Sequence, residues 1–385
     1  MKLTIWCELA AGGIADYAHD QATALVERGI DVELLCPPSY LDGRKPTYVA
    51  KPVLYDARPR RFSRWKVVRA VQIATGLLTN ARIVARHVAE RRSDAVLTHF
   101  SEYLAPLWAW RMRRLRRAGV RFFSVLHDPV RDYAVGPAWW HRWSVDVAFN
   151  MLDAVFVHTF DPVPVPAAVD VVWLPYGIHH FPDPTQTTAE VRRALDIPDG
   201  AVMLTSFGYV RDNKNIDLVI RAIADLPNIY LIVAGSEQAG GNRPLSFYQD
   251  LAAELGCADH CRWINRFVSV EDTANLMAAS DLSLLVYARR FVSSSAALGV
   301  TVNYRKPCLI SSGSATTETV VKQYRLGIWV EPDDVASIRA GLCDWLANGI
   351  VPDWDGYLED YGWARNARVI EQTILDHAAA RAAAA

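Results

Sequence analysis

The chain has 385 residues, 51% of them hydrophobic, which is enough for two domains of about 150–200 residues, each with a buried core. The formal net charge of −1 hides an asymmetry: residues 1–185 hold 23 Lys and Arg against 18 Asp and Glu, and the remainder holds 18 against 24. A total charge near zero, without a nucleic-acid-binding motif, argues against nucleic acid as a partner, whereas the basic first half suits an anionic one.

The distribution of cysteines and of apolar residues indicates the cellular compartment. The six cysteines are scattered over the chain, as expected of free thiols in a reducing environment. The first residues, MKLTIWCELA, lack the apolar run of a signal peptide, and no stretch of about 20 apolar residues could span a membrane. Cys257, His260 and Cys261 lie close together, but no second ligand pair follows at zinc-like spacing. We therefore expect a cytoplasmic protein without a metal site.

The first half alternates short apolar runs with helical patterns, which is typical of βαβ units in a parallel sheet. Strands are expected at 3–7, 32–36, 95–98, 122–126, 154–158 and 171–174. Helices are expected at 14–28, 64–92 and 104–117, and the Pro-rich stretch 37–59 is expected to be irregular.

The second half repeats the alternation after a hinge at 181–202, which is rich in Pro, Asp and Thr and contains a short helix. Strands are expected at 203–207, 230–234, 261–264, 282–286, 308–311 and 327–330. A terminal helix with a frayed Ala-rich tail closes the chain. We thus expect an N-terminal domain at 1–183, a C-terminal domain at 184–360, and a terminal helix at 361–385 that packs back toward the first domain.

The loop after the strand at 203–207 carries a glycine and two cations, Gly208, Arg211 and Lys214. In a parallel α/β unit this loop lies at the ligand-binding edge, and its residues suit a phosphate or diphosphate. The alternative is that the two cations are solvated surface.

Two further loops suit phosphate. Phe291–Val300, FVSSSAALGV, places Ser293, Ser294 and Ser295 where a helix begins, just after two arginines. The serines could form a phosphate nest or merely cap the helix. Gly12 and Gly13 follow the first strand, where they allow a ligand close to a helix N-terminus or simply form a tight turn.

The second half resembles the donor domain of the GT-B glycosyltransferases, specifically the family-4 group that uses nucleotide sugars. The matching segments are SFGYVRDNKNIDLVIRAI, YLIVAGS, NRFVSVEDTANLMAASDLSLL, SSSAALGVTVNYRKPCLISSG and TETVVKQYRLGIWVEPDD, with GGIADYAHDQATALVERGIDVELL, VLHD and LPYGI in the first half. The resemblance spans nearly the whole chain. It implies an α/β GT-B architecture, in which two Rossmann-like domains face each other across a cleft and the terminal helix crosses back to the first.

The resemblance also implies roles for residues at the matching positions. Arg211 and Lys214 would neutralise the donor diphosphate and stabilise it as a leaving group, an electrostatic role that needs no metal or other cofactor. The three serines would hold the distal phosphate. The other implied donor contacts are Gly208, Gly12 and Gly13 at the diphosphate, Arg266, Phe267 and Val268 at the base, and Glu318. His127 would face the transferred sugar, although a capped turn at 127–129 and a helix-capping Glu318 remain alternatives.

One departure from the family pattern concerns two glutamates eight residues apart. In the family the second holds the nucleotide ribose and the first touches the donor sugar. Their positions are taken here by Val292 and Val300. The family retains anomeric configuration without a clear enzymic nucleophile, so retention is the expectation that the resemblance carries.

The acceptor side is read from the first half. Residues 58–71 and 111–117 mix arginine and lysine with aromatic and aliphatic residues, a composition that could rest on anionic lipid headgroups. Trp139, Trp140 and Trp143 could bind an apolar or sugar part of an acceptor. The alternative reading makes the basic runs outer helix faces and the tryptophans core.

These observations predict a glycosyltransferase that moves a hexose from a nucleotide diphosphate sugar to a hydroxyl of a lipid-linked or glycan acceptor, in the cytoplasm or peripherally at the inner face of the membrane. Polysaccharide, glycolipid or glycoconjugate synthesis would use such an enzyme. Two alternatives stay open: a sugar-nucleotide epimerase of GT-B fold, and a degenerate GT-B protein that binds a nucleotide sugar without turnover.

Overall fold

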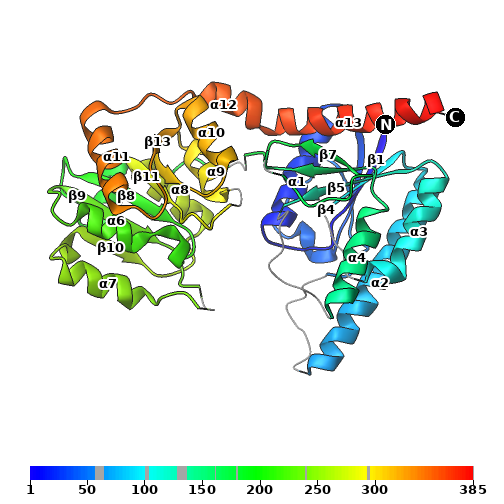
Figure 1. Ribbon diagram of the computed structural model, residues 1–385, viewed down its shortest axis with the longest axis horizontal. Coiled ribbons are helices and arrows are strands. Elements are labelled where there is room, and N and C mark those ends of the chain that lie inside the picture. Colours follow the sequence, from blue (N-terminus) through cyan, green and yellow to red (C-terminus); the bar gives the residue numbers. More distant parts are fainter. Residues whose placement is uncertain are drawn as a thin grey trace. The chain divides into compact units, whose positions relative to one another are not determined.

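The computed structural model describes residues 1–56, 65–99, 104–127, 137–160, 162–178, 181–238, 241–292 and 295–384. The chain divides into two compact units, which are taken here one at a time (Figure 1). Unit 1 comprises Met1–Gly177 and Tyr361–Ala385, and unit 2 comprises Ile178–Asp360.

Unit 1 is built on a parallel sheet of seven strands in the order β3-β2-β1-β4-β5-β6-β7. The order reverses between β1 and β4, which makes this a doubly wound sheet. The strands are β1 (Lys2–Trp6), β2 (Asp31–Leu35), β3 (Val49–Lys51), β4 (Ala95–His99), β5 (Arg121–Leu126), β6 (Ala154–Val157) and β7 (Asp170–Trp173). Strand β3 lies in the stretch predicted to be irregular, because three half-exposed residues give too short a pattern to detect.

Helices cover both faces of the first sheet. The helices are α1 (Gly13–Glu27), η1 (Pro38–Leu41), α2 (Lys66–Arg91), α3 (Ala105–Arg117), α4 (Ala138–Phe149) and α13 (Trp363–Ala384). One core joins the sheet to α1 and α13, and a second joins it to α2, α3 and α4. Alternate residues of a strand enter opposite cores, since side chains alternate across a sheet.

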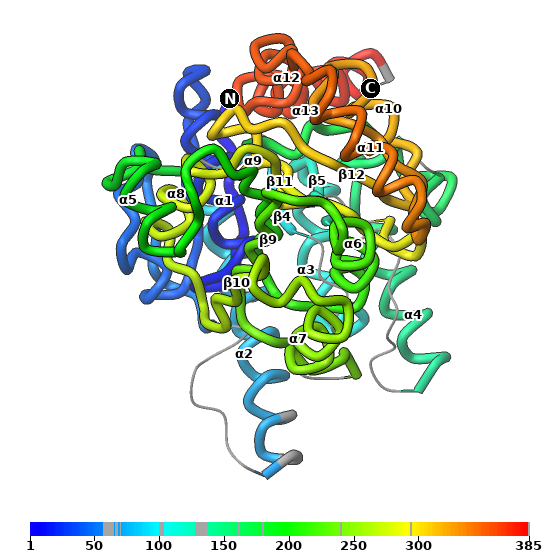
Figure 2. Tube along the Cα trace, turned by 90° about the vertical axis from the view of Figure 1, so that its left-hand side faces the viewer, coloured from blue at the N-terminus to red at the C-terminus, as the bar shows by residue number. Residues whose placement is uncertain are grey.

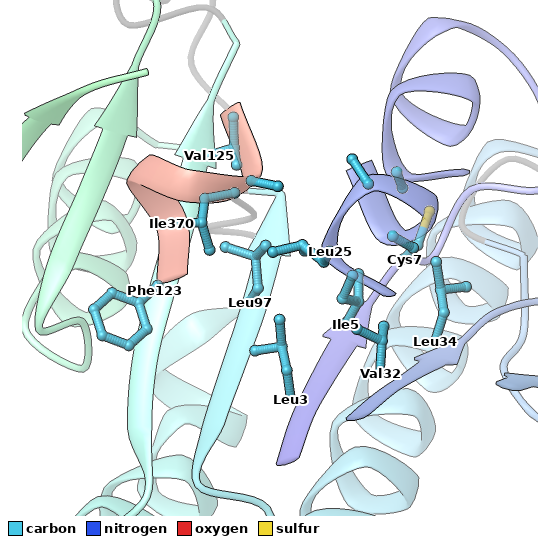
Figure 3. Close-up of a cluster of buried hydrophobic side chains, with 14 of the residues drawn as sticks. Leu3, Ile5, Cys7, Leu25, Val32, Leu34, Leu97, Phe123, Val125 and Ile370 are labelled. Atoms are coloured by element: carbon cyan, nitrogen blue, oxygen red, sulfur yellow. The ribbon is translucent and has the colours of Figure 1, made fainter. Parts of the chain in front are cut away.

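The C-terminal helix α13 is an integral part of unit 1. It packs on α1, and Ile370 is fully buried in the core that α1 shares with the sheet. Figure 3 shows Ile370 near Leu25 of α1, Leu97 of β4 and Val125 of β5. About 190 residues separate Tyr176 from α13, yet both contribute to this one core.

Unit 2 repeats the design with six parallel strands in the order β10-β9-β8-β11-β12-β13. The strands are β8 (Val202–Phe207), β9 (Ile229–Ala234), β10 (Cys261–Ile264), β11 (Leu282–Val286), β12 (Cys308–Ser311) and β13 (Gly327–Trp329). Each predicted strand of this half is present, and the order reverses between β8 and β11.

The helices of unit 2 also lie on both faces of its sheet. They are α5 (Thr188–Ala194), η2 (Asp212–Lys214), α6 (Ile216–Ile223), α7 (Leu245–Glu254), η3 (Ala258–His260), α8 (Val270–Ala279), α9 (Ala296–Asn303), α10 (Ala315–Tyr324), α11 (Val335–Asn348) and α12 (Trp354–Tyr361). Helices α6 and α7 lie side by side, as Figures 1 and 2 both show, and share a core with α11. Helices α5 and α8 fill the core on the opposite face.

Candidate functional site

The strand order of unit 2 reverses between β8 and β11. These strands pair only at Leu204 with Leu282 and at Thr205 with Ser283, whereas β8 pairs with β9 along its whole length. Beyond Thr205 the two strands run on without pairing. In open α/β sheets a ligand binds at this position.

Two glycines let the backbone close up at this edge. Gly208 follows β8 with φ 92, a conformation that L side chains rarely adopt, and its N–H donates to the Ala234 carbonyl at 2.8 Å. Gly235 follows β9, and a Cβ there would lie 2.3 Å from the Gly208 carbonyl oxygen. The ends of β8 and β9 therefore approach each other in a way that no other residue permits at position 235.

Arg211 and Lys214 lie together in the loop after β8, and both are half-buried. The Lys214 ammonium donates to the Phe207 carbonyl, while the Arg211 Nε is buried without a hydrogen-bond partner. Burial and, secondarily, the charge of Arg211 lower the pKa of Lys214 to about 7. Neither cation forms an ion pair with a carboxylate among the residues that the structure describes.

Asp212, the carboxylate in this loop, forms hydrogen bonds with residues other than Arg211 and Lys214. Asp212 accepts from the backbone N–H and Nε of Arg243 at 3.0 and 3.1 Å, and from the Tyr248 hydroxyl at 2.9 Å. These bonds hold the pKa of Asp212 below its usual value despite desolvation. Among the described residues, Arg211 and Lys214 are thus left without a carboxylate partner.

The N-terminus of α9 adjoins the two cations. The Ala288 N–H, after β11, donates to the Asn213 carbonyl at 2.8 Å and so joins the loop before α9 to the loop of Arg211. Ser295 caps α9 by accepting from the Leu298 N–H at 3.3 Å, and its Oγ lies 2.8 Å from the Tyr287 hydroxyl. Ser293 and Ser294 lie outside the described residues. The predicted capping role of Ser295 is present.

A hydrogen-bonded frame that sequence reasoning missed fixes these loops. Asp333 accepts from the Asn215 Nδ2 and from the Arg289 N–H, each at 3.0 Å, and so ties the loop after β8 to the loop after β11. Ser312 donates to the Phe291 carbonyl at 2.8 Å. The acidic residue stands in the segment VEPDD, but nothing in its local pattern indicates which loops it bridges.

The remaining predicted donor residues are positioned by other strand ends of unit 2. Arg266 and Phe267 follow β10; Arg266 pairs with Asp272 at 2.8 Å, and Phe267 is 76% exposed. The side chain of Val268 is buried in the core on the α5–α8 face. Glu318, in the first turn of α10, accepts from Lys322 at 2.5 Å, while Ser314 caps that helix. Glu318 is therefore not the capping residue.

The two valines that replace the family's glutamates differ in exposure. Val292 is 51% exposed in the loop before α9, and Val300 is buried on α9 itself. Neither can hydrogen bond a hydroxyl.

Unit 1 carries its own candidate residues at the equivalent edge. Gly12 is the N-cap residue of α1 with φ 92, and an added Cβ at Gly12 or Gly13 would meet nothing within 4 Å. His127 directly follows β5, and its Nε2 lies 2.9 Å from the Nδ1 of His99, which ends β4. The two rings are stacked at 5.1 Å.

A third histidine, His158, directly follows β6 and lies 5.4 Å from His127, centroid to centroid. Its Nδ1 donates to the Leu174 carbonyl at 2.9 Å, which leaves Nε2 as a buried acceptor without a partner among the described residues. Burial lowers the pKa of His99 to about 3 and that of His158 to about 4, so both imidazoles are neutral.

Tyr17 of α1 lies at the centre of this histidine cluster (His99, His127 and His158). Its ring is 4.6 Å from that of His127, and its buried hydroxyl accepts from Asn366 Nδ2 of α13 at 2.8 Å. Sequence reasoning found only His127. A usable signal was present, because three successive strands each end on a histidine, in THF, LHD and VHT.

The basic and aromatic segment of unit 1 lies partly on the surface. Trp110 is 43% exposed, Trp139 61% and Trp143 49%. The alternative that placed the tryptophans in the core is therefore wrong for Trp139 and Trp143. Residues 58–64 of the predicted basic stretch 58–71 lie outside the described residues.

Among the described residues, no group of three or more His, Cys, Asp or Glu side chains is arranged to hold a metal ion. In the same part of the chain, no helix is long and apolar enough to cross a bilayer.

Two family models match the chain, one in each half. The model of the glycosyl transferase 4-like domain matches residues 12–160, and the model of the glycosyl transferases group 1 matches residues 187–355. The first model includes the histidine cluster of unit 1, and the second includes Arg211, Ser295 and Glu318.

Relatives of known structure share the fold at low identity. Anabaena HepE, solved in complex with UDP and glucose, is 15% identical with a TM-score of 0.68, covering 98% of this chain and 100% of that one. Sucrose-phosphate synthase from Thermosynechococcus elongatus is 16% identical with a TM-score of 0.66, covering 98% and 99%. D-inositol 3-phosphate glycosyltransferase of Stackebrandtia nassauensis is 37% identical over 76 residues, which is 18% of this chain and only 17% of that protein.

Proposed function

The chain belongs to the family-4-like glycosyltransferases of GT-B fold, and on that premise we propose that it moves a hexose from a nucleotide diphosphate sugar to an acceptor hydroxyl. The observation that carries the proposal is the pair Arg211 and Lys214. Two cations without a described counter-ion lie at the sheet edge where β8 and β11 stop pairing, beside the N-terminus of α9. A diphosphate supplies the missing negative charge.

The chemistry proposed for this site is electrostatic. As the bond between sugar C1 and the diphosphate oxygen breaks, the electron pair stays on the diphosphate, and Arg211 and Lys214 stabilise that charge. The acceptor oxygen bonds to C1, and its proton leaves with the diphosphate. No metal or other cofactor is required, because the two side chains carry the charge. We propose retention of anomeric configuration, with the acceptor approaching on the face from which the diphosphate leaves.

The acceptor is proposed to be a lipid-linked or glycan precursor that unit 1 binds. The exposed Trp110, Trp139 and Trp143 offer apolar and stacking surface, and Arg111 lies 4.2 Å from the Trp110 ring centroid. Such a surface suits the interface of an anionic membrane, which would place the protein peripherally at the inner face.

Nucleotide release tests the proposal. The full-length protein is incubated with UDP-, GDP- and ADP-sugars and with acceptor extracts, and free nucleoside diphosphate is measured. Release that requires an acceptor supports transfer. Epimerisation of the nucleotide sugar in the absence of acceptor would identify an epimerase instead. The absence of both release and binding with every donor would contradict transferase and epimerase alike.

One observation favours a second candidate, a protein that binds a nucleotide sugar without transferring it. Val292 and Val300 cannot contact the ribose or sugar hydroxyls as glutamates do. Calorimetry separates the two functions, since this candidate predicts donor binding without turnover in any acceptor extract. Lys214→Ala alone does not separate them, because both predict weaker binding.

A further inference from the structure

The edge of the unit 1 sheet opposite the histidine cluster holds a hollow of about 470 Å³ lined by arginines. It lies where β5 begins, next to the last turns of α3 and α13. Its lining residues are Arg113, Arg116, Arg117, Arg121, Asn150, Asp153 and Arg381. Four of the five arginines lie within residues 113–121 and the fifth, Arg381, lies near the end of α13. We refer to this site as the arginine hollow.

A single carboxylate compensates this charge. Oδ1 of Asp153 lies 3.0 Å from Arg116 and 3.4 Å from Arg121, and its Oδ2 accepts from the Phe122 N–H at 2.8 Å. Asp153 is buried and its hydrogen-bonding capacity is largely used. Arg113, Arg117 and Arg381 have no ion pair with any residue that the structure describes. Five cations therefore face one anion.

Backbone carbonyls prevent several of these arginines from spreading apart. Arg121 donates to the His377 carbonyl at 2.6 Å, and Arg381 donates to the Arg116 carbonyl at 3.1 Å. Arg116 donates to the Asn150 carbonyl at 3.2 Å. Unpaired surface arginines normally fan out into solvent, because like charges repel. Here three of the arginines are already held by backbone carbonyls, so an anion that binds them loses less free energy to ordering of side chains.

We propose that the arginine hollow binds a phosphorylated molecule through its phosphate group. The planar guanidinium fork matches the oxygen geometry of phosphate, and several forks in one hollow suit a dianion or diphosphate better than a carboxylate. The hollow exceeds the size of one phosphate, so it accommodates a group attached to it. Because Arg381 and the His377 carbonyl form one wall, the bound anion also fastens the last turns of α13 to α3 and β5.

This site lies on the other edge of the sheet from His127 and in the other unit from Arg211. Its occupancy is therefore separate from donor binding, and the proposal stands or falls independently of the proposed function.

Calorimetry with pyrophosphate tests the proposal on full-length protein that carries Arg211→Gln and Lys214→Met, because the loop of these two residues would otherwise bind the same probe. This double variant is the parent for the comparisons that follow. Arg113→Gln with Arg117→Gln removes two unpaired cations from the hollow and is expected to weaken binding about tenfold or more. The matched control is Arg111→Gln with Arg114→Gln. It removes the same charge from the same helix, but these side chains lie over the Trp110 ring, at 4.2 and 5.9 Å, instead of lining the hollow. The control is expected to bind within about twofold of the parent. Equal losses in both variants would show a diffuse charge effect and overturn the proposal.

A second readout follows α13. Hydrogen exchange over residues 377–384 is expected to slow when pyrophosphate is added to the parent protein and not when it is added to the Arg113–Arg117 variant. The melting temperature of the variant without ligand confirms that it is folded, so a loss of binding is not a loss of structure. Unchanged exchange in the parent at saturating pyrophosphate contradicts the fastening of α13.

The source of the phosphate is resolved by competition. Soluble dihexanoyl phosphatidate, used below its micelle concentration, presents a lipid headgroup without a surface. If it displaces pyrophosphate and binds more tightly, the ligand class is a lipid headgroup; if pyrophosphate binds more tightly, it is a free phosphorylated solute. Both outcomes support the site, whereas no measurable binding of either probe refutes it.

Discussion

Lys214 lies in the proposed donor-binding loop after β8, and its pKa falls in the physiological range. Its pKa of about 7 means that the free protein at pH 8 holds it mostly neutral. A bound diphosphate favours the ammonium form, so binding at pH 8 takes up a proton. Affinity for a donor is then expected to fall as pH rises above about 7 and to level off below it. Calorimetry of a bound nucleotide sugar in buffers of different ionisation enthalpy measures the uptake.

Two variants sharpen that test. Lys214→Met is expected to abolish the proton uptake and weaken the donor about tenfold or more. Lys306 is the control, since it is also partly buried, has a lowered pKa and donates to the Ala278 carbonyl away from the site. Uptake that persists in Lys214→Met disproves the assignment. In the free protein the unfolded chain binds more protons between pH 7 and 10.5, so the contribution of Lys214 to stability rises with pH there.

We propose that His127 faces the transferred sugar and that His99 acts through it as a positioning residue. With His99 neutral and its Nε2 buried without a described partner, the proton is best placed on Nδ1, because an orphaned acceptor costs less than an orphaned donor. Nδ1–H then donates to His127 Nε2 and fixes that ring and its tautomer. His99→Leu is expected to lower transfer about tenfold, as the loss of one buried hydrogen bond would.

His99→Asn is the variant expected to restore the hydrogen bond to His127, because the asparagine amide nitrogen occupies nearly the position of the histidine Nδ1. It is expected to recover most of the rate, and donor binding should be unchanged in both variants. A packing role alone predicts that the two variants fail together.

At the scale of elements, removing the N-cap of α9 tests whether the start of this helix contributes to donor binding. Ser295→Ala removes the cap of α9, and Ser269→Ala removes the cap that accepts from the Asp272 N–H of α8. Each is expected to destabilise unit 2 by about 1 kcal/mol. Only Ser295→Ala is expected to weaken donor binding, since α9 adjoins Arg211 and Lys214. Urea unfolding and donor calorimetry measure the two effects, and equal binding in both variants excludes α9 from the site.

The strands of unit 2 show why that helix is well placed. Strands β8 and β11 stop pairing after Thr205, and Asp333 and Asn213 then hold the diverging loops together from outside the sheet. The loop of Arg211 and Lys214 is thereby held in place, so binding an anion there is expected to need little reorganisation.

For the whole molecule, the separate cores predict separable stability. Ile370 of α13 belongs to the core of unit 1, and Ile338 of α11 belongs to that of unit 2; both are fully buried. Truncating either to alanine is expected to cost about 3 kcal/mol in its own unit. Hydrogen exchange followed by mass spectrometry assigns the loss. Faster exchange of unit 2 strands in Ile370→Ala contradicts the assignment of α13 to unit 1.

Much of this fold was predictable because strands and helices here follow strong local patterns. The unit 2 strands are short, buried apolar runs, which periodicity detects, whereas β3 is three residues long and half-exposed. Arg211 and Lys214 were found from their place after a predicted strand. His99 and His158 were missed, because a histidine at one strand end means little until the strand order places three such ends side by side.

The sequence by itself determined the two α/β halves, the family, and the cations after β8, since each depends on local spacing or on motifs in order. Only the tertiary structure decided which loops meet. Asp333 bridges segments more than 40 residues apart along the chain, Tyr17 joins three strand ends to α13, and Arg381 completes a hollow begun at Arg113. The physical reason is that charge compensation and burial are sums over neighbours in space, and no local pattern in a chain encodes those neighbours.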